Sequence, residues 1–381
     1  MNILILNYEY PPLGGGAGVC SQYHAKGLAQ CGYRVTVLTA WFKGYPEIEY
    51  FDNLTIVRLK SQRKFLYKSN PVEMLMWVKQ AILYFASNQD LSFSICLANF
   101  IIPGGIVAKY LKRKFGIPYF ILSHGQDIPF FFPKQMLKYH LITYFWLRSI
   151  VSGADKLLLL TQMIKKNADS YLGKNNRHKN MVIANGCDTE TFYPDYTNAT
   201  KEFTILFVGR LVEQKDPFTF LKAVKLLAEL NVQFKVIILG DGPLRKKMLQ
   251  FCNKYNLTQR VDFKGWVSKP EMVKHYQQAS LQVMSSRDEA MSIAALESLS
   301  CGTYMLSTPV SGNTDLIENE INGEFFDFSD SKGLASKIEK FYFNRFLTGY
   351  QVPEIFLKRF RNTYNWDTIV KEYDKLIKFY I

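Results

Sequence analysis

Short runs of valine, isoleucine and leucine alternate with longer stretches of helical periodicity along the first half of the chain. Runs that are apolar on both sides and separated by helices predict a parallel sheet covered on both faces. Strands are predicted at residues 3–6, 35–38, 56–59, 93–96, 119–122 and 157–160. Helices are expected between them, for example at residues 19–29, 72–86 and 136–151.

The pattern restarts after an interruption at Asn185-Gly186 and the polar run 189–201. Further strands are predicted at residues 204–208, 234–239, 261–263, 281–284 and 303–306. The predicted fold is therefore α/β, with two tandem Rossmann-like, doubly wound parallel-sheet domains at residues 1–188 and 200–365. The last segment, 366–381, is expected to pack back onto the first domain as an amphipathic helix. Because such sheets bind ligands at the carboxyl ends of their strands, two facing domains would form one central cleft.

Composition narrows the classes of protein that fit this pattern. A chain of 381 residues that is 48% hydrophobic is too long for one ordinary core and too apolar for global disorder. Its net charge of +14 predicts a polyanionic partner: nucleic acid, an anionic membrane surface or a phosphorylated small molecule. Six cysteines without a C-x-x-C pair indicate neither a disulfide framework nor a zinc site.

Location is predicted from two further segments. No basic segment or cleavage site follows Met1, so we expect a cytoplasmic protein. Residues 91–108 carry no charge, but Pro103-Gly104-Gly105 interrupts them. A buried strand, a turn and the start of a helix are expected there, and not a transmembrane segment.

A glycine-rich segment, Gly14-Gly15-Gly16, follows the first predicted strand and precedes a helix. Such a turn exposes N–H groups at a helix N-terminus, which favour an anion. The segment fits neither the dinucleotide fingerprint nor a phosphate loop that ends in Gly-Lys-Ser/Thr. Anion binding and a plain tight turn therefore both stay open.

Another glycine turn follows the first strand of the second domain. Gly209 precedes Arg210 and, five residues later, Lys215. Two cations at this spacing can flank one diphosphate, the arginine as a planar fork of donors and the lysine as a point charge. A solvated basic turn is the alternative.

Gly240-Asp241-Gly242-Pro243 is a third turn of this kind. Glycines followed by proline at a first helical position are a structural device that needs no function. The segment is therefore expected to be mainly structural, and it could line a nucleotide pocket together with Trp266 and Val267.

The most informative stretch is residues 285–302. Ser292 is a good N-cap and Gly302 a good stop, so a helix of roughly two to three turns is predicted between them. Glu289 then lies in the loop before the helix and Glu297 within it, so the two are not a side-by-side acid/base pair. Two carboxylates at different positions along a bound ligand are suited to accept hydrogen bonds from sugar hydroxyls. The helix amides between them are suited to bind a phosphate. Two exposed carboxylates at a helix end are the alternative.

In this order the segments resemble glycosyltransferase family 4, the retaining, nucleotide-sugar-dependent enzymes of GT-B fold. The resemblance covers essentially the whole chain. It rests on the glycine loop, residues 123–127 (SHGQD) and 183–188 (IANGCD), Gly209-Arg210-Leu211 with Lys215, Gly240–Pro243, and the E-x7-E pair Glu289 and Glu297.

The resemblance implies a role for each motif. Arg210 and Lys215 would neutralise the donor diphosphate, and Glu297 would accept hydrogen bonds from the ribose hydroxyls. Catalytic roles are implied for His124, which would line the reaction centre, and for Glu289, which would hold the transferred sugar. The alternative for His124 is a buried histidine that is hydrogen-bonded within the core and has no catalytic role. The donor-binding residues implied are Gly15, Gly16, Arg210, Lys215, Gly240, Trp266, Val267, Met291, Ser292, Ile293 and Glu297.

Three positions depart from the family pattern. Ser292 and Asp216 stand where glycine is usual, and Tyr304 stands at a frequent proline position. These departures bear on the orientation of the donor sugar. They leave open a second possibility, a glycosyltransferase-like module that binds a nucleotide sugar without turnover.

The expected activity is hexosyl transfer from a nucleotide-diphosphate sugar, a UDP-sugar being favoured, to a hydroxyl of a glycan or lipid-linked acceptor. Bacterial surface polysaccharide or glycolipid assembly is the expected setting, and the resemblance implies retention at the anomeric carbon. The sequence contains no Asp-x-Asp motif, so we expect neither a metal nor another cofactor. Arg210, Lys215 and helix N-termini would balance the charge of the leaving phosphate.

Positive charge gathers in one region. Residues 101–180 hold 13 lysines and arginines against three acidic residues, interleaved with aromatic segments at 130–134 and 139–148. This combination predicts peripheral binding of the first domain to an anionic membrane surface. An ordinary helix with an aromatic core face is the alternative for residues 139–147. Nucleic-acid binding is a third function class, but no helix-turn-helix, RNP or zinc pattern supports it.

Overall fold

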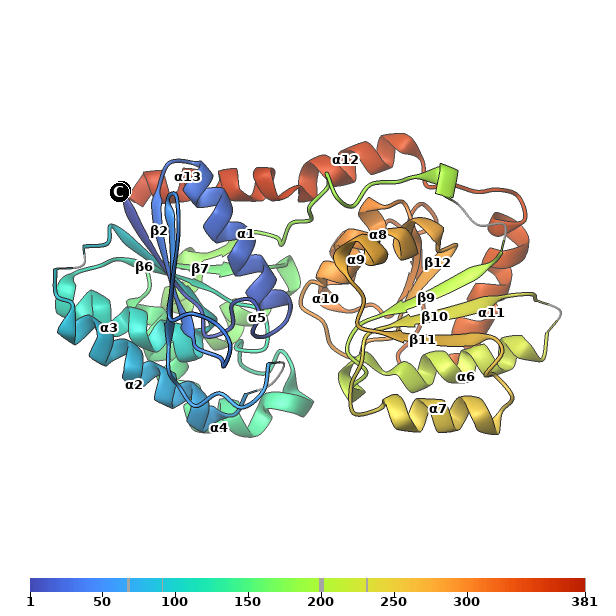
Figure 1. The fold of residues 1–381 in the computed structure, drawn as a ribbon, viewed down its shortest axis with the longest axis horizontal. Coiled ribbons are helices and arrows are strands. Elements are labelled where there is room, and N and C mark those ends of the chain that lie inside the picture. Colours follow the sequence, from blue (N-terminus) through green and yellow to red (C-terminus); the bar gives the residue numbers. More distant parts are fainter. Residues whose placement is uncertain (67–68, 91, 199–201, 231, 381) are drawn as a thin grey trace. The chain divides into compact units, whose positions relative to one another are not determined.

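The computed structural model describes residues 1–66, 69–90, 92–198, 202–230 and 232–380, without the side chains of residues 133–135. The chain divides into two compact units (Figure 1). The first holds residues 1–185 and the C-terminal helix α13 (Trp366–Tyr380), and the second holds residues 186–365. Residues 186–188 belong to the second unit, where Cys187 forms a β-bridge with Asn365 and Asp188 pairs with Lys269.

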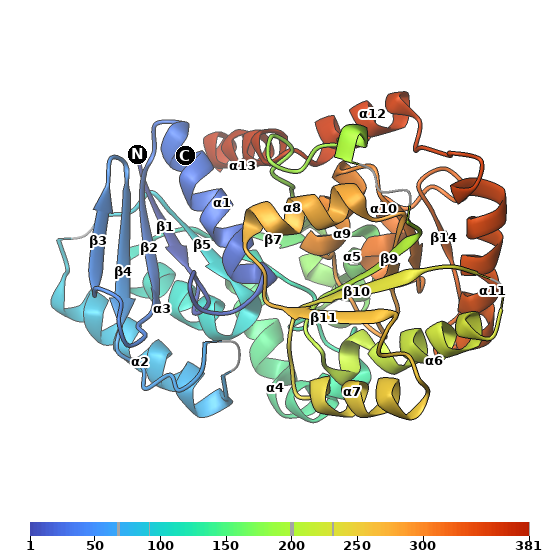
Figure 2. The ribbon, with the colours of Figure 1, turned by 45° about the vertical axis from the view of Figure 1, so that its right-hand side comes forward.

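The first unit is built on one sheet, which has eight strands within the described residues, in the order β3-β4-β2-β1-β5-β6-β7-β8. All neighbours are parallel except β3 and β4, which form an antiparallel pair at one edge (Figure 2). The strands are β1 (Asn2–Leu6), β2 (Arg34–Ala40), β3 (Ile48–Phe51), β4 (Leu54–Leu59), β5 (Ile95–Asn99), β6 (Tyr119–Leu122), β7 (Lys156–Leu159) and β8 (Asn180–Val182). The sequence pattern missed β3 and β8, because one is an exposed edge strand and the other is three residues long.

The first unit also contains α1 (Gly16–Gln30), α2 (Pro71–Ser87), α3 (Gly105–Phe115), α4 (Pro133–Gly153) and α5 (Gln162–Tyr171). Helix α13 packs on α1, where Tyr23 stacks on Trp366 with ring centroids 4.9 Å apart. A Cβ atom at Gly27 would lie 2.5 Å from the Val370 side chain, so glycine permits this close approach. Tyr33 adds a hydrogen bond of 2.8 Å to Asp374 of α13.

Residue 91 of the uncharged stretch lies outside the described residues; residues 92–108 form the end of a loop, the buried strand β5, a short π-helical turn at Phe100–Gly104 and the start of α3. This confirms the expected strand, turn and helix. Across the described ranges, the structure contains no helix with the length and apolar character needed to cross a membrane.

The second unit has a fully parallel sheet, with six strands among the described residues in the order β11-β10-β9-β12-β13-β14. The strands are β9 (Thr204–Val208), β10 (Lys235–Leu239), β11 (Val261–Gly265), β12 (Leu281–Met284), β13 (Tyr304–Ser307) and β14 (Gly323–Phe325). Its helices are α6 (Pro217–Ala228), α7 (Arg245–Lys254), α8 (Lys269–Gln278), α9 (Ile293–Ser300), α10 (Ser311–Leu316), α11 (Ser331–Phe341) and α12 (Glu354–Tyr364). Helix α7 begins at Arg245, so Pro243 lies in the turn before it and not at its first position.

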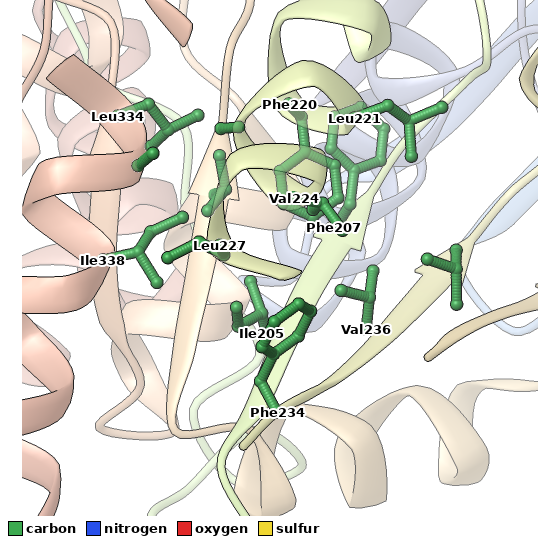
Figure 3. Close-up of a cluster of buried hydrophobic side chains, with 14 of the residues drawn as sticks. Ile205, Phe207, Phe220, Leu221, Val224, Leu227, Phe234, Val236, Leu334 and Ile338 are labelled. Carbon is green, nitrogen blue, oxygen red and sulfur yellow. The ribbon is translucent and has the colours of Figure 1, made fainter. Parts of the chain in front are cut away.

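One hydrophobic core fixes the strands of this unit against α6 and α11 (Figure 3). Phe207 of β9 stacks on Phe220 of α6 with centroids 5.4 Å apart, and both rings are buried. Leu334 and Ile338 of α11 close the same cluster. Aromatic packing at this density holds the carboxyl end of β9 in a fixed position, and the candidate site begins there.

Candidate donor-binding site

The sheet topology of the second unit marks one place for a ligand. Strand β9 has β10 on one side and β12 on the other, so the strand order reverses at β9. In open α/β sheets, ligands bind outside the carboxyl ends of the strands at such a switch point. The loop after β9 carries Arg210 and Lys215, and the loop after β12 carries Glu289. The topology therefore brings these predicted donor-site segments together.

Hydrogen bonds hold the two loops against each other. The Ser285 hydroxyl donates to the Lys215 carbonyl at 3.0 Å. The Arg287 amide donates to the Gln214 carbonyl at 2.8 Å, and the Gln214 side chain donates to the Asp288 carbonyl at 2.9 Å. Because these bonds run in both directions between the loops, the spacing between the lysine and the glutamate is fixed before a ligand binds.

Lys215 forms an ion pair with the Glu289 carboxylate, and both side chains are largely buried. The lysine side chain runs over Gly209, where a Cβ atom would lie 3.4 Å from the lysine Cε. Arg210 is exposed, and within the described chain its guanidinium group has neither a hydrogen bond nor an ion pair, whereas its carbonyl accepts from the Val212 amide at 2.9 Å. Of the two predicted cations, the arginine is thus available to a ligand directly, and the lysine is held beside a carboxylate.

Helix α9 starts directly after Ser292, as predicted, although the serine hydroxyl makes no capping hydrogen bond. Met291 and Ser292 are buried and Ile293 is half-buried. A Cβ atom at Gly312 would lie 2.4 Å from the Met291 Cα, so α10 packs tightly against this segment. The first amides of a helix have no intrahelical acceptor, and those of α9 begin four residues after Glu289 along the chain.

Glu297 lies one turn further into α9 and faces a different partner. The Tyr276 hydroxyl donates to its carboxylate at 3.2 Å. Burial raises the pKa of Glu297 to about 7, despite the opposing effect of this hydrogen bond. A raised carboxyl pKa means that this group favours the folded state most below its ordinary pKa, and this contribution is lost as the pH rises toward 7. The expected alternative of an exposed helix-end carboxylate does not describe Glu297.

The turn at Gly240 has a clear structural role, and its place in a nucleotide pocket stays a prediction. Gly240 has φ +118°, and a Cβ atom there would lie 2.1 Å from the Gly209 carbonyl oxygen. A Cβ atom at Gly242 would lie 2.5 Å from the Leu211 carbonyl oxygen. Both glycines let the loops after β9 and β10 touch through their backbones. This backbone contact fixes the loop after β10 against the loop that carries Arg210 and Lys215.

Trp266 and Val267 follow β11. The indole of Trp266 is 69% exposed, and Val267 is half-buried. Within the described part of the chain, no ring contact or hydrogen bond joins this indole to another side chain. The Gly265 carbonyl directly before it accepts from the Gly240 amide at 2.7 Å, so the loop after β11 lies beside the turn at Gly240. The role of the Trp266 indole stays a prediction.

Asp216 connects the loop after β9 to the loop after β12. It has φ +43°, is buried, and accepts hydrogen bonds from Thr219 at 3.0 Å and from Arg287 at 3.2 Å. Its side chain thus links the lysine loop to the glutamate loop at the position where glycine is usual in the family. The departure from glycine is offset by these bonds.

We expect Asp216→Ala to lower the free energy of unfolding by about 2–3 kcal/mol, because it removes these two bonds and a third from the Ser329 hydroxyl at 3.4 Å, and keeps a strained backbone. Asp216→Gly should cost about 1 kcal/mol less, since glycine tolerates positive φ. Urea unfolding of the two variants measures the difference. Equal losses would contradict a strained backbone at this position.

The predicted residues of the first unit gather at its own switch point, between β1 and β5. Gly15 is the N-cap of α1, Gly16 is its first residue, and both are exposed. A Cβ atom at Gly15 would meet nothing within 4 Å, whereas one at Gly18 would lie 2.9 Å from the Leu13 carbonyl oxygen. The packing constraint thus falls on Gly18, whereas Gly15 and Gly16 are exposed residues at the start of the helix.

His124 lies in the loop after β6 and is half-buried against the ring of Phe100, 4.7 Å away. Its Nε2 is 2.9 Å from the Asn99 Oδ1, which also accepts a hydrogen bond from Ser21. Burial lowers the pKa of His124 to about 4, so the imidazole is neutral at physiological pH. A neutral, hydrogen-bonded imidazole can accept or donate at one nitrogen, but it cannot supply a positive charge.

Three residues of these sites were not found from the sequence: Asn99, Tyr276 and Arg287. Asn99 ends a buried strand, and a polar residue at that point was a usable signal. Tyr276 and Arg287 act through partners distant in sequence, Glu297 and Asp216. Nothing in the local pattern indicates those pairings.

Two Rossmann-like units in one chain, each with polar loops at its switch point, define a GT-B fold. Comparison with known proteins agrees. The model of glycosyltransferase family 4 matches residues 14–191, and the model of glycosyl transferases group 1 matches residues 188–350. The chain belongs to glycosyltransferase family 4.

Two distant relatives match this chain over most of their own length. An uncharacterised glycosyltransferase of Methanocaldococcus jannaschii is 25% identical over 89% of this chain and 87% of its own. The UDP-Gal:α-D-GlcNAc-diphosphoundecaprenol α-1,3-galactosyltransferase of Escherichia coli is 27% identical over 73% of this chain and 72% of its own. The sucrose-phosphate synthase structure from Thermosynechococcus elongatus superposes with a TM-score of 0.85 at 18% identity, covering 99% of this chain and 98% of that one.

Proposed function

We propose that this glycosyltransferase moves a hexose from a UDP-sugar to a hydroxyl of a glycan or lipid-linked acceptor, with retention at the anomeric carbon. The observation that carries the proposal is the pairing of Lys215 with Glu289 at the switch point of the second sheet. A cation for a diphosphate and a carboxylate for sugar hydroxyls lie side by side there. The exposed Arg210 guanidinium and the first amides of α9 supply further donors for phosphate oxygens.

The chemistry requires charge to be stabilised on the departing diphosphate. Arg210 and Lys215 fulfil that need in the proposal, and a diphosphate that reaches the lysine would compete with Glu289 for it. The released carboxylate would then be available to the transferred sugar. The departing phosphate oxygen would act as base for the acceptor hydroxyl. Assembly of a bacterial surface polysaccharide or glycolipid is the proposed setting, supported by the lipid-diphosphate acceptor in the name of the E. coli relative.

A thermal-shift screen of UDP-, GDP- and ADP-sugars tests the donor. The expected ligand raises the melting temperature of the wild type and not of Glu297→Ala, because the ribose loses its acceptor. Glu229→Ala, at an exposed glutamate of the same unit, is the matched control and should respond like the wild type. If no nucleotide sugar shifts the wild type, the proposed function is wrong. A shift without sugar transfer would instead indicate a binding module without turnover.

Donor affinity should depend on pH through Glu297. Its pKa of about 7 means that the carboxylate that accepts from ribose is the minor form at pH 6 and the major form at pH 8. The affinity should therefore rise about tenfold over this interval, because binding requires the deprotonated group. Isothermal titration at several pH values measures it. Glu297→Gln should bind more weakly and without this slope; a slope that persists in the variant would assign the titration to another group.

We propose that no metal takes part. In the described ranges no three histidine, cysteine, aspartate or glutamate side chains gather closely enough to hold an ion. The proposal itself rests on the two cations at the diphosphate position. Transfer rates should stay within about twofold after treatment with EDTA, as charge balance by the protein requires. Loss of activity that Mg²⁺ or Mn²⁺ restores would contradict this.

A further inference from the structure

Helix α4 presents an apolar surface that no part of the described chain covers. We call this surface the α4 face and define it by Leu137, Leu141, Ile142, Phe145 and Trp146. Ile142 is 84% exposed and Phe145 is 80% exposed, and the other three range from 42 to 62%. At 100° per residue these five positions fall on one side of the helix.

The opposite side of α4 fixes the helix to its unit. His140, Leu147, Ile150 and Val151 are buried there, each at most 2% exposed. The aromatic residues Phe145 and Trp146 are therefore not part of a core face, which was the alternative expected for residues 139–147. A helix that is already anchored on one side and apolar on the other has room for a further partner.

Basic groups surround the α4 face. The helix contains no acidic residue, and Lys138 and Arg148 are exposed on it. Lys109 of α3 donates to the Ser149 carbonyl at 3.0 Å, and Lys179 donates to the Ser152 carbonyl at 2.7 Å. Two lysines from other elements are thus fixed beside the exposed serines of α4.

The three acidic residues of the region 101–180 do not offset this charge. Asp155 is paired with Lys112 at 2.8 Å, and Asp169 with Lys165 at 2.7 Å. Asp127 is buried and accepts hydrogen bonds from Ser123 and the Ile101 amide. The surface around α4 therefore carries a positive excess next to large apolar side chains.

We propose that the α4 face binds an anionic lipid bilayer, with α4 lying in the plane of the interface. Ile142 and Phe145 would enter the acyl boundary, and the surrounding lysines and arginines would contact headgroup phosphates. Charge complementarity selects this occupant: an apolar protein surface would leave the cations without a partner. The inference goes beyond the sugar-transfer proposal, because it does not involve the donor site.

Co-sedimentation with vesicles tests it. Wild-type protein should sediment with phosphatidylglycerol/phosphatidylcholine vesicles at low salt and remain in solution with phosphatidylcholine alone. Ile142→Ser combined with Phe145→Ser should weaken binding at least about tenfold. Equal binding to both kinds of vesicle, or no binding by the wild type, would overturn the proposal.

The chain offers a closely matched control. Ile355 and Phe379 are each 83% exposed, and Phe379 contacts Tyr380 at 5.5 Å much as Phe145 contacts Tyr144 at 5.6 Å. Ile355→Ser combined with Phe379→Ser removes the same apolar groups elsewhere and should bind vesicles like the wild type. If both double variants lose binding equally, general surface hydrophobicity explains the result and the α4 face has no special role.

A second copy of the chain is the competing occupant. Sedimentation equilibrium without lipid should give the same mass for the wild type and the α4 double variant. A wild-type dimer that the double variant converts to monomer would assign the α4 face to self-association. Both double variants should keep the nucleotide-sugar thermal shift, so a failure of vesicle binding would leave the donor proposal intact.

Discussion

Lys215→Met should reduce the turnover of sugar transfer by about 10²–10³-fold. The lysine is the proposed counter-charge of the leaving diphosphate, and methionine keeps the length of the side chain but not its charge. The substitution also leaves the largely buried Glu289 carboxylate without its cation. Release of nucleotide diphosphate at saturating donor measures the effect.

Lys225→Met is the matched control for this experiment. Lys225 also forms an ion pair, with Glu229, but at an exposed position on α6 of the same unit. Its loss should change turnover by less than about twofold, because exposed ion pairs contribute little. Lys215→Arg should recover part of the activity. Turnover of Lys215→Met close to that of the wild type would remove the lysine from the mechanism.

Gly240→Ala should lower the free energy of unfolding by about 4 kcal/mol, the largest stability effect we expect from a single methyl group here. Two causes add: alanine is strained at φ +118°, and its Cβ would lie 2.1 Å from the Gly209 carbonyl oxygen. That oxygen belongs to the backbone and cannot move alone. Denaturant unfolding measures the loss.

Gly265→Ala separates the two causes. Gly265 has φ +70°, but a Cβ atom there would meet nothing within 4 Å. This variant should therefore lose only the conformational part, about 1 kcal/mol. Similar losses in the two variants would show that the contact with Gly209 relaxes and that the turn is less rigid than its geometry indicates.

The strands on which the site depends could be predicted because they are buried on both faces. Residues 204–208 and 281–284 were predicted with the bounds that the structure gives. Strands β3, β8 and β14 were missed for two different reasons: β3 is largely exposed, and β8 and β14 are only three residues long. Hydrophobic pattern marks burial, so it cannot find elements in which burial is partial or brief.

For the site, the sequence was sufficient to predict features that depend on neighbouring residues along the chain. It was insufficient to predict contacts between residues that are brought together only by folding. The start of α9 after Ser292 and the location of Glu289 in the loop before it were predicted correctly. The pairing of Lys215 with Glu289 joins residues 74 positions apart, and the reversal of strand order at β9 brings them together. Tyr276 and Arg287 were missed for the same reason.

The chain leaves its first unit after Asn185 and returns to it at Trp366, so α13 completes a unit that began 365 residues earlier. A fragment that stops at residue 185 would therefore uncover α1 at His24 and Gly27, and should aggregate when expressed alone. Residues 186–365 are contiguous and could be produced separately for ligand studies. The chain therefore passes between the two units twice, near residue 185 and near residue 366. A protease cut at one of these places would leave the two units connected through the other place.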